Sequence, residues 1–301
     1  MVKMAETEQK SRVSVVIVTY NSSDTVSDCI ESILENYPLS KEIFVIDNAS
    51  EDGSVGLIAS RFPSVHMIVN ALNRGFAAAN NQAFPGCKGE YILFLNPDAA
   101  LTSKALETMI GFMDQNRHIG LAGAKIVNPD GTLQESISYR YPGEKHTSGE
   151  LNGMKGSIAC VLGACMIART DLIRKIGGFD EDYFLYGEDQ ELCLQVRRHG
   201  YEIGYITEAV IIHIGGHSER SSIPEELWKK KTRAEYIFYR KHYNPDTIRK
   251  ITRAHRFKSW WRILTIHMTL PFLCHREKSQ EKLSKYRAIL QTLHELELKG
   301  V

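Results

Sequence analysis

The chain has 301 residues, of which 43% are hydrophobic, 24% charged and 9% aromatic, as in a folded globular protein of one large or two smaller domains. These values exclude a disordered, collagen-like or coiled-coil chain. Because 37 Lys and Arg stand against 36 Asp and Glu, the formal charge is +1, which argues against a polybasic nucleic-acid binder. The six cysteines form no Cys-x-x-Cys pair, so we expect reduced, buried thiols rather than disulfides or a zinc site.

Residues 1–12 are polar and carry charges of both signs, which predicts an N-terminal tail without a secretory signal and a cytoplasmic protein. The first patterned segment, 13–19, is a β-branched run typical of a buried parallel strand. A helix capped by Ser23 or Asp24 and closed by Pro38 follows, and strands then alternate with helices. In order, these are a strand over 43–46, a helix over 54–62, a strand over 65–69, a helix near 77–83 and a strand over 91–95.

The pattern continues less regularly after residue 98. We expect a helix over 104–116, a strand or strand-turn over 119–127, a turn at 128–131 and a mobile loop over 135–155 beside a site. A strand over 158–167, helices over 170–176 and 189–199 that glycines end, and a strand over 209–212 complete the series. The sequence therefore predicts an α/β fold with a doubly wound, mostly parallel sheet flanked by helices.

The last eighty or so residues differ in charge. Between 220 and 262, 13 Lys and Arg stand against 4 Asp and Glu, a local charge of +9 that leaves −8 for the rest of the chain. Aromatic residues alternate with these cations, and the apolar run over 259–274 is too short and too interrupted to span a bilayer. Two interpretations stay open: 220–274 contacts an anionic membrane surface, or a helical basic extension packs on the preceding domain with a solvated charged face.

Polar residues follow four of the predicted strands. Ligands bind beyond the carboxyl ends of the strands in open parallel α/β sheets, so these residues predict a polar pocket of nucleotide size. Neither G-x-G-x-x-G after the first strand nor G-x-x-x-x-G-K-[ST] is present, so something other than a glycine-rich loop must hold phosphates. The strand-end residues are Thr19, Tyr20, Asn21, Asp47, Asn48, Asn73, Arg74, Gly75, Asn96 and Asp98.

Four acidic or imidazole side chains are candidates for metal binding or proton transfer. A divalent cation can hold a diphosphate, and Asp98 offers a hard oxygen ligand, although Asn-Pro-Asp also commonly opens a turn. Glu188 and Asp189 stand at a helix start, where the dipole favours ionised carboxylates and where a capping pair is also expected. His213 follows an apolar strand and is either a ligand or a buried core imidazole.

A series of motifs, in this order and at this spacing, resembles glycosyltransferase family 2 in its rhamnosyltransferase-like branch. They are VSVVIVTYN, IDNASEDGS, NRGFAAANNQ, LFLNPDA, GACMIARTDLIRKIGGFDEDYFLYGEDQELCLQVRRHGY and HIGGHS, over about residues 13–218. The resemblance implies a GT-A fold and an inverting transfer of a sugar from a nucleoside diphosphate to a hydroxyl group. We therefore divide the chain into a catalytic domain over 13–218, with a nucleotide-binding half over 13–100 and an acceptor-side half over 101–218, and a helical C-terminal extension over 219–301.

The resemblance also implies roles for individual residues on the donor side. Asp98 and His213 would bind Mg²⁺ or Mn²⁺, with His217 as the alternative to His213. Family members usually carry Asp-x-Asp where this chain has Asn96-Pro97-Asp98, so an amide replaces one acidic ligand and we expect weaker metal binding. By similarity, the residues around the pyrimidine and ribose are Thr19, Asn21, Asp47 and Asn48, and those that line the nucleotide are Asn73, Arg74, Gly75 and Asn80.

Charge movement in such a reaction explains why these residue types are needed. Breaking the anomeric C–O bond leaves negative charge on the diphosphate and positive charge on the sugar, so a cation is needed on one side and a base on the other. Asp189 aligns with the family's base, with Glu188 as the alternative, and would take the acceptor proton. Gly163 would let the acceptor approach the backbone, while Phe184 and Tyr186 would pack either on a sugar ring or in the core.

The expected substrates follow from the resemblance. The favoured donor is dTDP-rhamnose, with UDP-hexose or UDP-galactofuranose as the alternative, and the acceptor is a glycan or a polyprenyl-linked molecule of cell-surface polysaccharide synthesis at the inner face of the plasma membrane. A non-catalytic nucleotide-sugar-binding subunit is a further alternative, against which Asp189 and His213 argue, because a binding module needs no base opposite a metal. Nucleic-acid binding would rest on the +9 segment alone, and we do not expect it.

Overall fold

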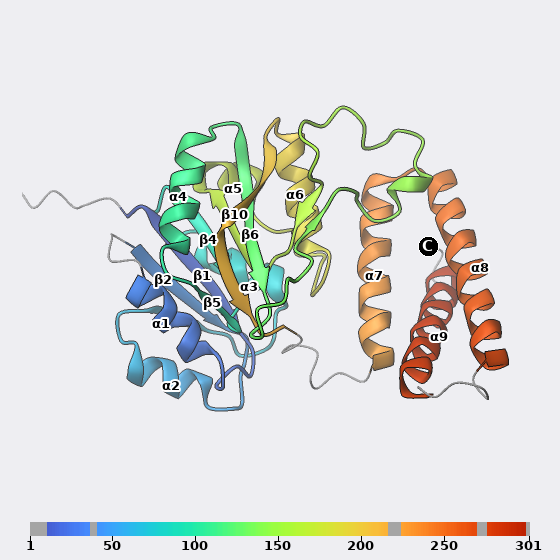
Figure 1. Cartoon of the computed structure of the whole chain (residues 1–301), viewed down its shortest axis with the longest axis horizontal. Coiled ribbons are helices and arrows are strands. Elements are labelled where there is room, and N and C mark those ends of the chain that lie inside the picture. The colour runs from blue at the N-terminus through green and yellow to red at the C-terminus, as the bar shows by residue number, and fades with distance from the viewer. Residues whose placement is uncertain (1–10, 37–40, 216–223, 270–275, 299–301) are drawn as a thin grey trace, which may run out of the picture. The chain divides into compact units, whose positions relative to one another are not determined.

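The computed structural model of the chain describes residues 11–36, 41–215, 224–269 and 276–298 (Figure 1). The chain divides into two compact units. Unit 1 comprises residues 1–139, 154–184 and 188–217, and unit 2 comprises 140–153, 185–187 and 218–301. Most of the predicted N-terminal tail and His217 lie outside the described residues.

The centre of unit 1 is a mixed, mostly parallel sheet. Its described strands are β1 (Val13–Thr19), β2 (Lys41–Asp47), β3 (His66–Val69), β4 (Tyr91–Leu95), β5 (Ala99–Leu101), β6 (Ile119–Val127), β9 (Cys165–Arg169) and β10 (Glu202–His213). They lie in the order β3-β2-β1-β4-β9-β6-β10-β5. The pairs β3–β2, β2–β1, β1–β4 and β6–β10 are parallel, whereas β4–β9, β9–β6 and β10–β5 are antiparallel. The predicted α/β class is confirmed.

Helices cover both faces of this sheet (Figure 1). One buried cluster joins α1 (Val26–Asn36), α2 (Ser54–Arg61) and α4 (Ala105–Gln115) to strand residues such as Val15 and Leu93. A second cluster joins α3 (Phe76–Ala83), α5 (Thr170–Ile176) and α6 (Glu188–Arg198) to strand residues such as Val16 and Phe94. Because successive strand residues point to opposite faces, β1 and β4 supply both clusters and read as continuous apolar runs.

Four expectations about single elements were wrong. The strand predicted over 158–167 is two strands, β8 (Cys160–Val161) and β9, with a turn between them. The sequence did not indicate this turn, because it lies within a run that is apolar apart from one glycine. The loop predicted over 135–155 contains β7 (Ile137–Ser138), which pairs with β8, and the short 3₁₀ helix η1 (Glu144–His146). The three-residue β5 was not predicted. β10 is longer than predicted because a bulge between Ile206 and Val210 interrupts its alternation.

The described cysteines are buried and unpaired, as the sequence predicts. They form no disulfide, and Cys274 lies outside the described residues. Burial raises the pKa of the Cys87 thiol to about 11 and that of Cys165 to about 12. Both are therefore protonated core side chains at neutral pH. The thiols are Cys29, Cys87, Cys160, Cys165 and Cys193.

Unit 2 contains three helices in its described C-terminal part, α7 (Pro224–His242), α8 (Pro245–Thr269) and α9 (Arg276–Leu298). α9 packs against both α7 and α8. The aromatic residues of α7 are mostly buried, including Tyr236, Phe238 and Tyr239, whereas those near the end of α8 are exposed. The apolar run over 259–274 forms no helix of its own in the described residues but continues α8 to Thr269. Within the described ranges, none of the helices has the length and apolar character needed to cross a membrane.

Candidate active site

A buried carboxylate and a buried imidazole meet beyond the end of β4. β5 pairs antiparallel with β10 and sets His213 opposite Ala99, which brings the preceding residue, Asp98, beside the imidazole. Asp98 Oδ1 lies 3.3 Å from His213 Nε2, and both residues are 8% exposed. Ile214 N donates to the backbone oxygen of Asp98 at 3.0 Å, which fixes this register. The structure thus brings together the two residues that were predicted to share a metal ion.

Gln134 determines which imidazole nitrogen of His213 carries a proton. Gln134 Nε2 donates to Asn128 Oδ1 at 2.7 Å and to the backbone oxygen of His213 at 2.6 Å. Its Oε1 is therefore the acceptor, and His213 Nδ1, 2.9 Å away, donates to it. A neutral imidazole then presents the lone pair of Nε2 to the Asp98 carboxylate, so a proton or a metal ion is needed between the two acceptors. In metal-binding histidines, the ring nitrogen that does not bind the metal typically donates a hydrogen bond in this way.

The donor set fits a divalent cation whose coordination a bound diphosphate completes. Carboxylate oxygen and imidazole nitrogen both suit Mn²⁺, and Mg²⁺ is commonly held by one or two carboxylates together with substrate phosphates. In the part of the chain that the structure describes, no group of three or more His, Cys, Asp and Glu side chains could hold a metal. Among the described residues, Asp98 and His213 are therefore the two candidate ligands here, and Asn96 stands two residues before Asp98 in place of a second carboxylate.

Two more carboxylates stand at the start of α6. Gly163 N donates to Asp189 Oδ2 at 3.1 Å, and Gln190 N donates to Asp189 Oδ1 at 2.8 Å. The turn that carries Gly163 also joins the end of β4, because Asn96 N donates to Ala164 O at 3.0 Å. Two hydrogen bonds therefore connect Asp189 to the segment that leads into Asp98.

Glu188 and Asp189 differ in how their charge is stabilised. Burial, together with the adjacent charge of Asp189, raises the pKa of Glu188 to about 8, and Glu188 Oε2 is buried without a hydrogen-bond partner. Burial also raises the pKa of Asp189, whereas the N–H groups of Gln190 and Gly163 lower it. Asp189 is half-buried and accepts hydrogen bonds from two N–H groups. These bonds stabilise its ionised form, whereas the surroundings of Glu188 favour the protonated form. This favours Asp189 over Glu188 as the base.

The ends of β1 and β2 form a hydrogen-bonded wall. Thr19 Oγ1 donates to Asp47 Oδ1 at 3.0 Å, and Ser50 N donates to Asp47 Oδ2 at 2.9 Å. Asn21, with a φ of +50°, donates from its backbone N to Ser50 Oγ at 2.8 Å. Because Thr19 and Asp47 are fully buried, their side chains shape this wall, whereas Tyr20 and Asn21 are exposed beside it.

The loop before α3 is held by Asn48. Asn48 Nδ2 donates to Gly75 O at 3.0 Å, while its Oδ1 accepts from Arg74 N at 3.3 Å and from Asn70 Nδ2 at 3.0 Å. Asn73 Oδ1 in turn accepts from Gly75 N at 2.9 Å. The predicted nucleotide residues of β2 and of the segment after β3 therefore form one network.

Gly75 joins this network to the segment before α6. Phe76 N donates to Phe184 O at 2.8 Å, and a Cβ on Gly75 would lie 2.4 Å from the same oxygen. With its φ of +82°, the position requires glycine. The Phe184 ring is 52% exposed, which favours contact with a ligand over core packing. Asn80 is buried, donates to Phe76 O at 2.9 Å and has an Oδ1 without a protein partner.

Tyr186 belongs to unit 2, whereas Gly163 and Phe184 belong to unit 1. Its backbone has a φ of +71°, a strained value for a residue other than glycine. Lys231 Nζ lies 4.9 Å from the centre of its ring. The acceptor-side role of Tyr186 stays a prediction.

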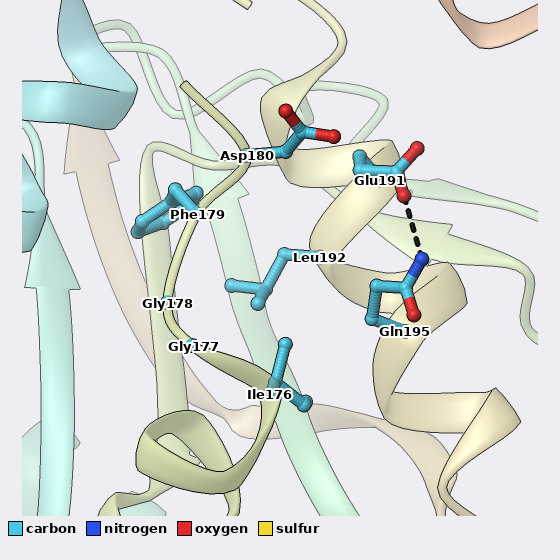
Figure 2. A pocket seen from close by; sticks show the side chains of 8 residues that line it. All are labelled: Ile176, Gly177, Gly178, Phe179, Asp180, Glu191, Leu192 and Gln195. Atoms are coloured by element: carbon cyan, nitrogen blue, oxygen red, sulfur yellow. Dashed lines mark hydrogen bonds between the residues drawn. The ribbon is translucent and has the colours of Figure 1, made fainter. Parts of the chain in front are cut away.

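A pocket of about 280 Å³ lies between α5 and α6, lined by Asp180, Glu191 and Gln195 among others (Figure 2). Figure 2 shows the hydrogen bond between Gln195 and Glu191. Gln195 Nε2 donates to Glu191 Oε1 at 2.7 Å, and Tyr183 Oη donates to Glu191 Oε2 at 3.2 Å. None of the predicted site residues lines this pocket. We therefore place the candidate site at the strand ends.

Sequence reasoning missed Gln134 and Asn70. The turn at Asn128-Pro129-Asp130-Gly131 does indicate that the chain turns back, and Gln134 N donates to Ile126 O at 2.9 Å just beyond it. That Gln134 reaches His213 depends on the pairing of β6 with β10, which joins segments about eighty residues apart. Local sequence carries no signal for this contact.

Comparisons with known proteins agree with the fold. The profile described as Glycosyl transferase family 2 matches residues 14–177, more than half of the chain. The N-acetylglucosaminyl-diphospho-decaprenol L-rhamnosyltransferase of Mycobacterium tuberculosis is 23% identical over 278 residues, which cover 82% of this chain and 86% of the relative.

Two solved structures are similar over nearly the whole chain. The mannosyltransferase PcManGT from Pyrobaculum calidifontis, in complex with GDP-Man and Mn²⁺, has a TM-score of 0.61 at 16% identity and covers 95% of this chain and 86% of its own. TarS 1–349 from S. aureus, in complex with UDP, has a TM-score of 0.52 at 14% identity, with coverages of 96% and 92%. At these identities the structures show the shared GT-A fold.

Proposed function

Since the chain belongs to glycosyl transferase family 2, we propose that it is an inverting, metal-dependent transferase that moves rhamnose from dTDP-rhamnose to a hydroxyl group of a glycan or polyprenyl-linked acceptor. The observation that carries the proposal is the 3.3 Å approach of Asp98 Oδ1 to His213 Nε2 at the strand ends. The choice of rhamnose and of a lipid-linked acceptor is supported by the Mycobacterium tuberculosis relative, whose name states both.

On the donor side, Asp98 and His213 would hold Mg²⁺ or Mn²⁺. When bound, the ion stabilises the negative charge that develops on the leaving diphosphate. Gln134 acts through His213, because its Oε1 keeps the proton on Nδ1 and so leaves Nε2 to bind a cation. The wall of Thr19, Asp47 and Ser50, together with Asn48, would set the position of the base and ribose through the exposed residues beside it.

On the acceptor side, Asp189 takes the proton of the attacking hydroxyl group. The hydroxyl oxygen forms the new bond to the anomeric carbon as the C–O bond to the diphosphate breaks, and attack from the opposite face inverts that carbon. Gly163 N, 3.1 Å from Asp189 Oδ2, holds the carboxylate in place. Glu188, whose pKa burial raises to about 8, keeps its proton at neutral pH and so leaves Asp189 as the charged partner.

A UDP-hexose or UDP-galactofuranose is the second candidate donor. The observation in its favour is that the similar structure of TarS 1–349 is a complex with UDP, whereas PcManGT is a complex with GDP-Man and Mn²⁺. The reaction would take place in the cytoplasm or at the inner face of the plasma membrane, where a nucleotide sugar and a polyprenyl-linked acceptor can meet.

Thermal unfolding with dTDP-, UDP- and GDP-sugars, each with and without Mn²⁺, tests the proposal. A ligand at about 100 times its Kd stabilises the folded chain by about 2.7 kcal/mol. We expect dTDP-rhamnose with Mn²⁺ to protect most and Asp98→Asn to lose the Mn²⁺-dependent part, while Asp171→Asn, at a fully exposed carboxylate, keeps it. Strongest protection by a UDP-sugar would select the second donor, and no protection by any sugar nucleotide would contradict the proposed function.

A further inference from the structure

The exposed side of α8 carries a stripe of large apolar side chains. Phe257, Trp260, Trp261, Leu264 and Met268 are between 39% and 69% exposed. Their spacings of three, four, seven and eleven residues from Phe257 put all five on one side of the helix. We call these five residues the α8 stripe.

The α8 stripe is not the side on which the helix packs within unit 2. Ile251 and Ser259 are buried on the other side, and α8 packs against α9. An apolar stripe of five residues that include two adjacent tryptophans is unusual on a free surface and marks a contact with another partner.

Basic residues border the α8 stripe. Lys250 and Arg253 precede Phe257 by seven and four residues and so extend the same side of the helix, and both are exposed. The acidic residue of α8, Asp246, stands in its first turn and pairs with Arg249. Asp246 lies on the same side as the α8 stripe, four residues before Lys250, so this side presents cations and aromatic rings together with a single carboxylate at the start of the helix.

We infer that the α8 stripe docks on an anionic membrane surface, with the helix lying in the interface. Tryptophan rings favour the headgroup region of a bilayer, and nearby Lys and Arg are attracted to anionic lipids. The apolar side chains add the burial that holds such an interfacial helix. The inference deepens the proposed function and rests on it for its purpose, because a polyprenyl-linked acceptor lies in the same membrane.

A second copy of the chain suits this surface less well. A twofold contact through the α8 stripe would bring the same surface of both copies together and would bring the basic borders of the two helices close to each other. Like charges that face each other across an interface oppose association. The charge pattern therefore favours a negatively charged lipid surface.

Co-sedimentation with vesicles of phosphatidylcholine and phosphatidylglycerol, against vesicles of phosphatidylcholine alone, tests the inference. We expect the full chain to bind the anionic vesicles at low salt and to lose binding at high salt. Lys250→Glu with Arg253→Glu should lower the partition coefficient by about 30-fold or more, and Trp260→Ser with Trp261→Ser by about tenfold or more. The matched control is Tyr139→Ser, which removes an equally exposed aromatic ring from unit 1.

Tryptophan fluorescence gives a second readout. Anionic vesicles should shift the wild-type emission to shorter wavelength, and Trp260→Phe with Trp261→Phe, which leaves Trp228 as the single tryptophan, should abolish the shift. No binding at low salt, binding that the α8 variants do not weaken, or a dimer that these variants dissociate would each overturn the inference. All variants should keep donor protection in thermal unfolding, so loss of vesicle binding is distinguishable from failure of the proposed function.

Discussion

Asp52, beside α2, and Glu188, at the start of α6, are carboxylates of one domain with opposite surroundings. Partial burial raises the pKa of Asp52, but the hydrogen bonds from Ser54 and Ser23 outweigh it and lower the pKa to about 2. Glu188 is buried beside Asp189 with one oxygen unpartnered, and its pKa is raised to about 8. The carboxylate beside α2 is thus a fixed charge in a hydrogen-bonded frame, whereas the surroundings of the carboxylate at the start of α6 favour a bound proton.

Asp98 belongs to neither type. It faces Nε2 of His213, whose Nδ1 is held by Gln134, and this arrangement fits the cation site that we propose. These three environments fit the framework, metal and proton roles that we propose for the acidic side chains. Single substitutions separate these roles, and we expect their effects to decrease from Asp189, through Gln134 and Glu188, to Asp52.

Asp189→Asn should remove the proposed base and leave the donor-binding residues intact. Because an amide cannot take the acceptor proton, we expect kcat to fall by about 10²–10⁴-fold with donor binding unchanged. Turnover assays and donor protection in thermal unfolding measure the two effects, with Asp171→Asn as the control. Normal turnover, or loss of donor protection, would mean that Asp189 has another role.

Gln134→Ala should weaken the metal site without touching a metal ligand. The change removes the acceptor for His213 Nδ1, and loss of such a partner typically costs about 10–100-fold in metal affinity or activity. The Mn²⁺ concentration for half-maximal turnover measures it. Gln134→Glu, which keeps an acceptor for Nδ1, should restore part of the affinity, and an unchanged Mn²⁺ requirement in Gln134→Ala would contradict the positioning role.

Glu188→Gln should change how stability depends on pH. A folded-state pKa raised from 4.5 to about 8 means that, within this window, the folded chain binds a proton that the unfolded chain has lost. Wild-type stability therefore falls as pH rises through this window, by up to about 1.4 kcal/mol for each pH unit. The variant binds no such proton, so its free energy of unfolding relative to wild type should increase from pH 5 to pH 8, as measured by urea unfolding. Parallel profiles would show that Glu188 is not held protonated.

Asp52→Asn should have the smallest effect, with the opposite pH dependence. The folded-state pKa lies below the ordinary 3.8, so Asp52 stabilises the fold above that pH and loses this contribution as pH falls toward about 2. Because the carboxylate is exposed, we expect a cost of only about 0.5 kcal/mol at neutral pH. Urea unfolding at pH 7 and near pH 3 measures the difference, and a larger cost at the lower pH would contradict this interpretation.

Sequence patterns within single segments predicted several helices and strands correctly. The bounds of β1, β4, β6 and α5 agree with those expected, because the strands are largely apolar runs and Gly177 follows α5 directly. Contacts between segments that are distant in the sequence were harder to predict. The family motifs indicated Asp98 and His213, but the antiparallel β5–β10 pair that joins them, and Gln134 behind them, depend on pairings that no single segment specifies. The exposure of the α8 stripe likewise follows from how α8 packs on α9.

Anomalous diffraction at the manganese edge, from crystals grown with Mn²⁺ and dTDP, would reveal whether Asp98 and His213 share a metal ion. We expect one manganese peak that Asp98 Oδ1 and His213 Nε2 both bind, next to the diphosphate, with the Asp189 carboxylate open to the sugar side. A diphosphate bound without a peak at these two residues, or a peak held elsewhere, would contradict the proposed metal site and the reaction built on it.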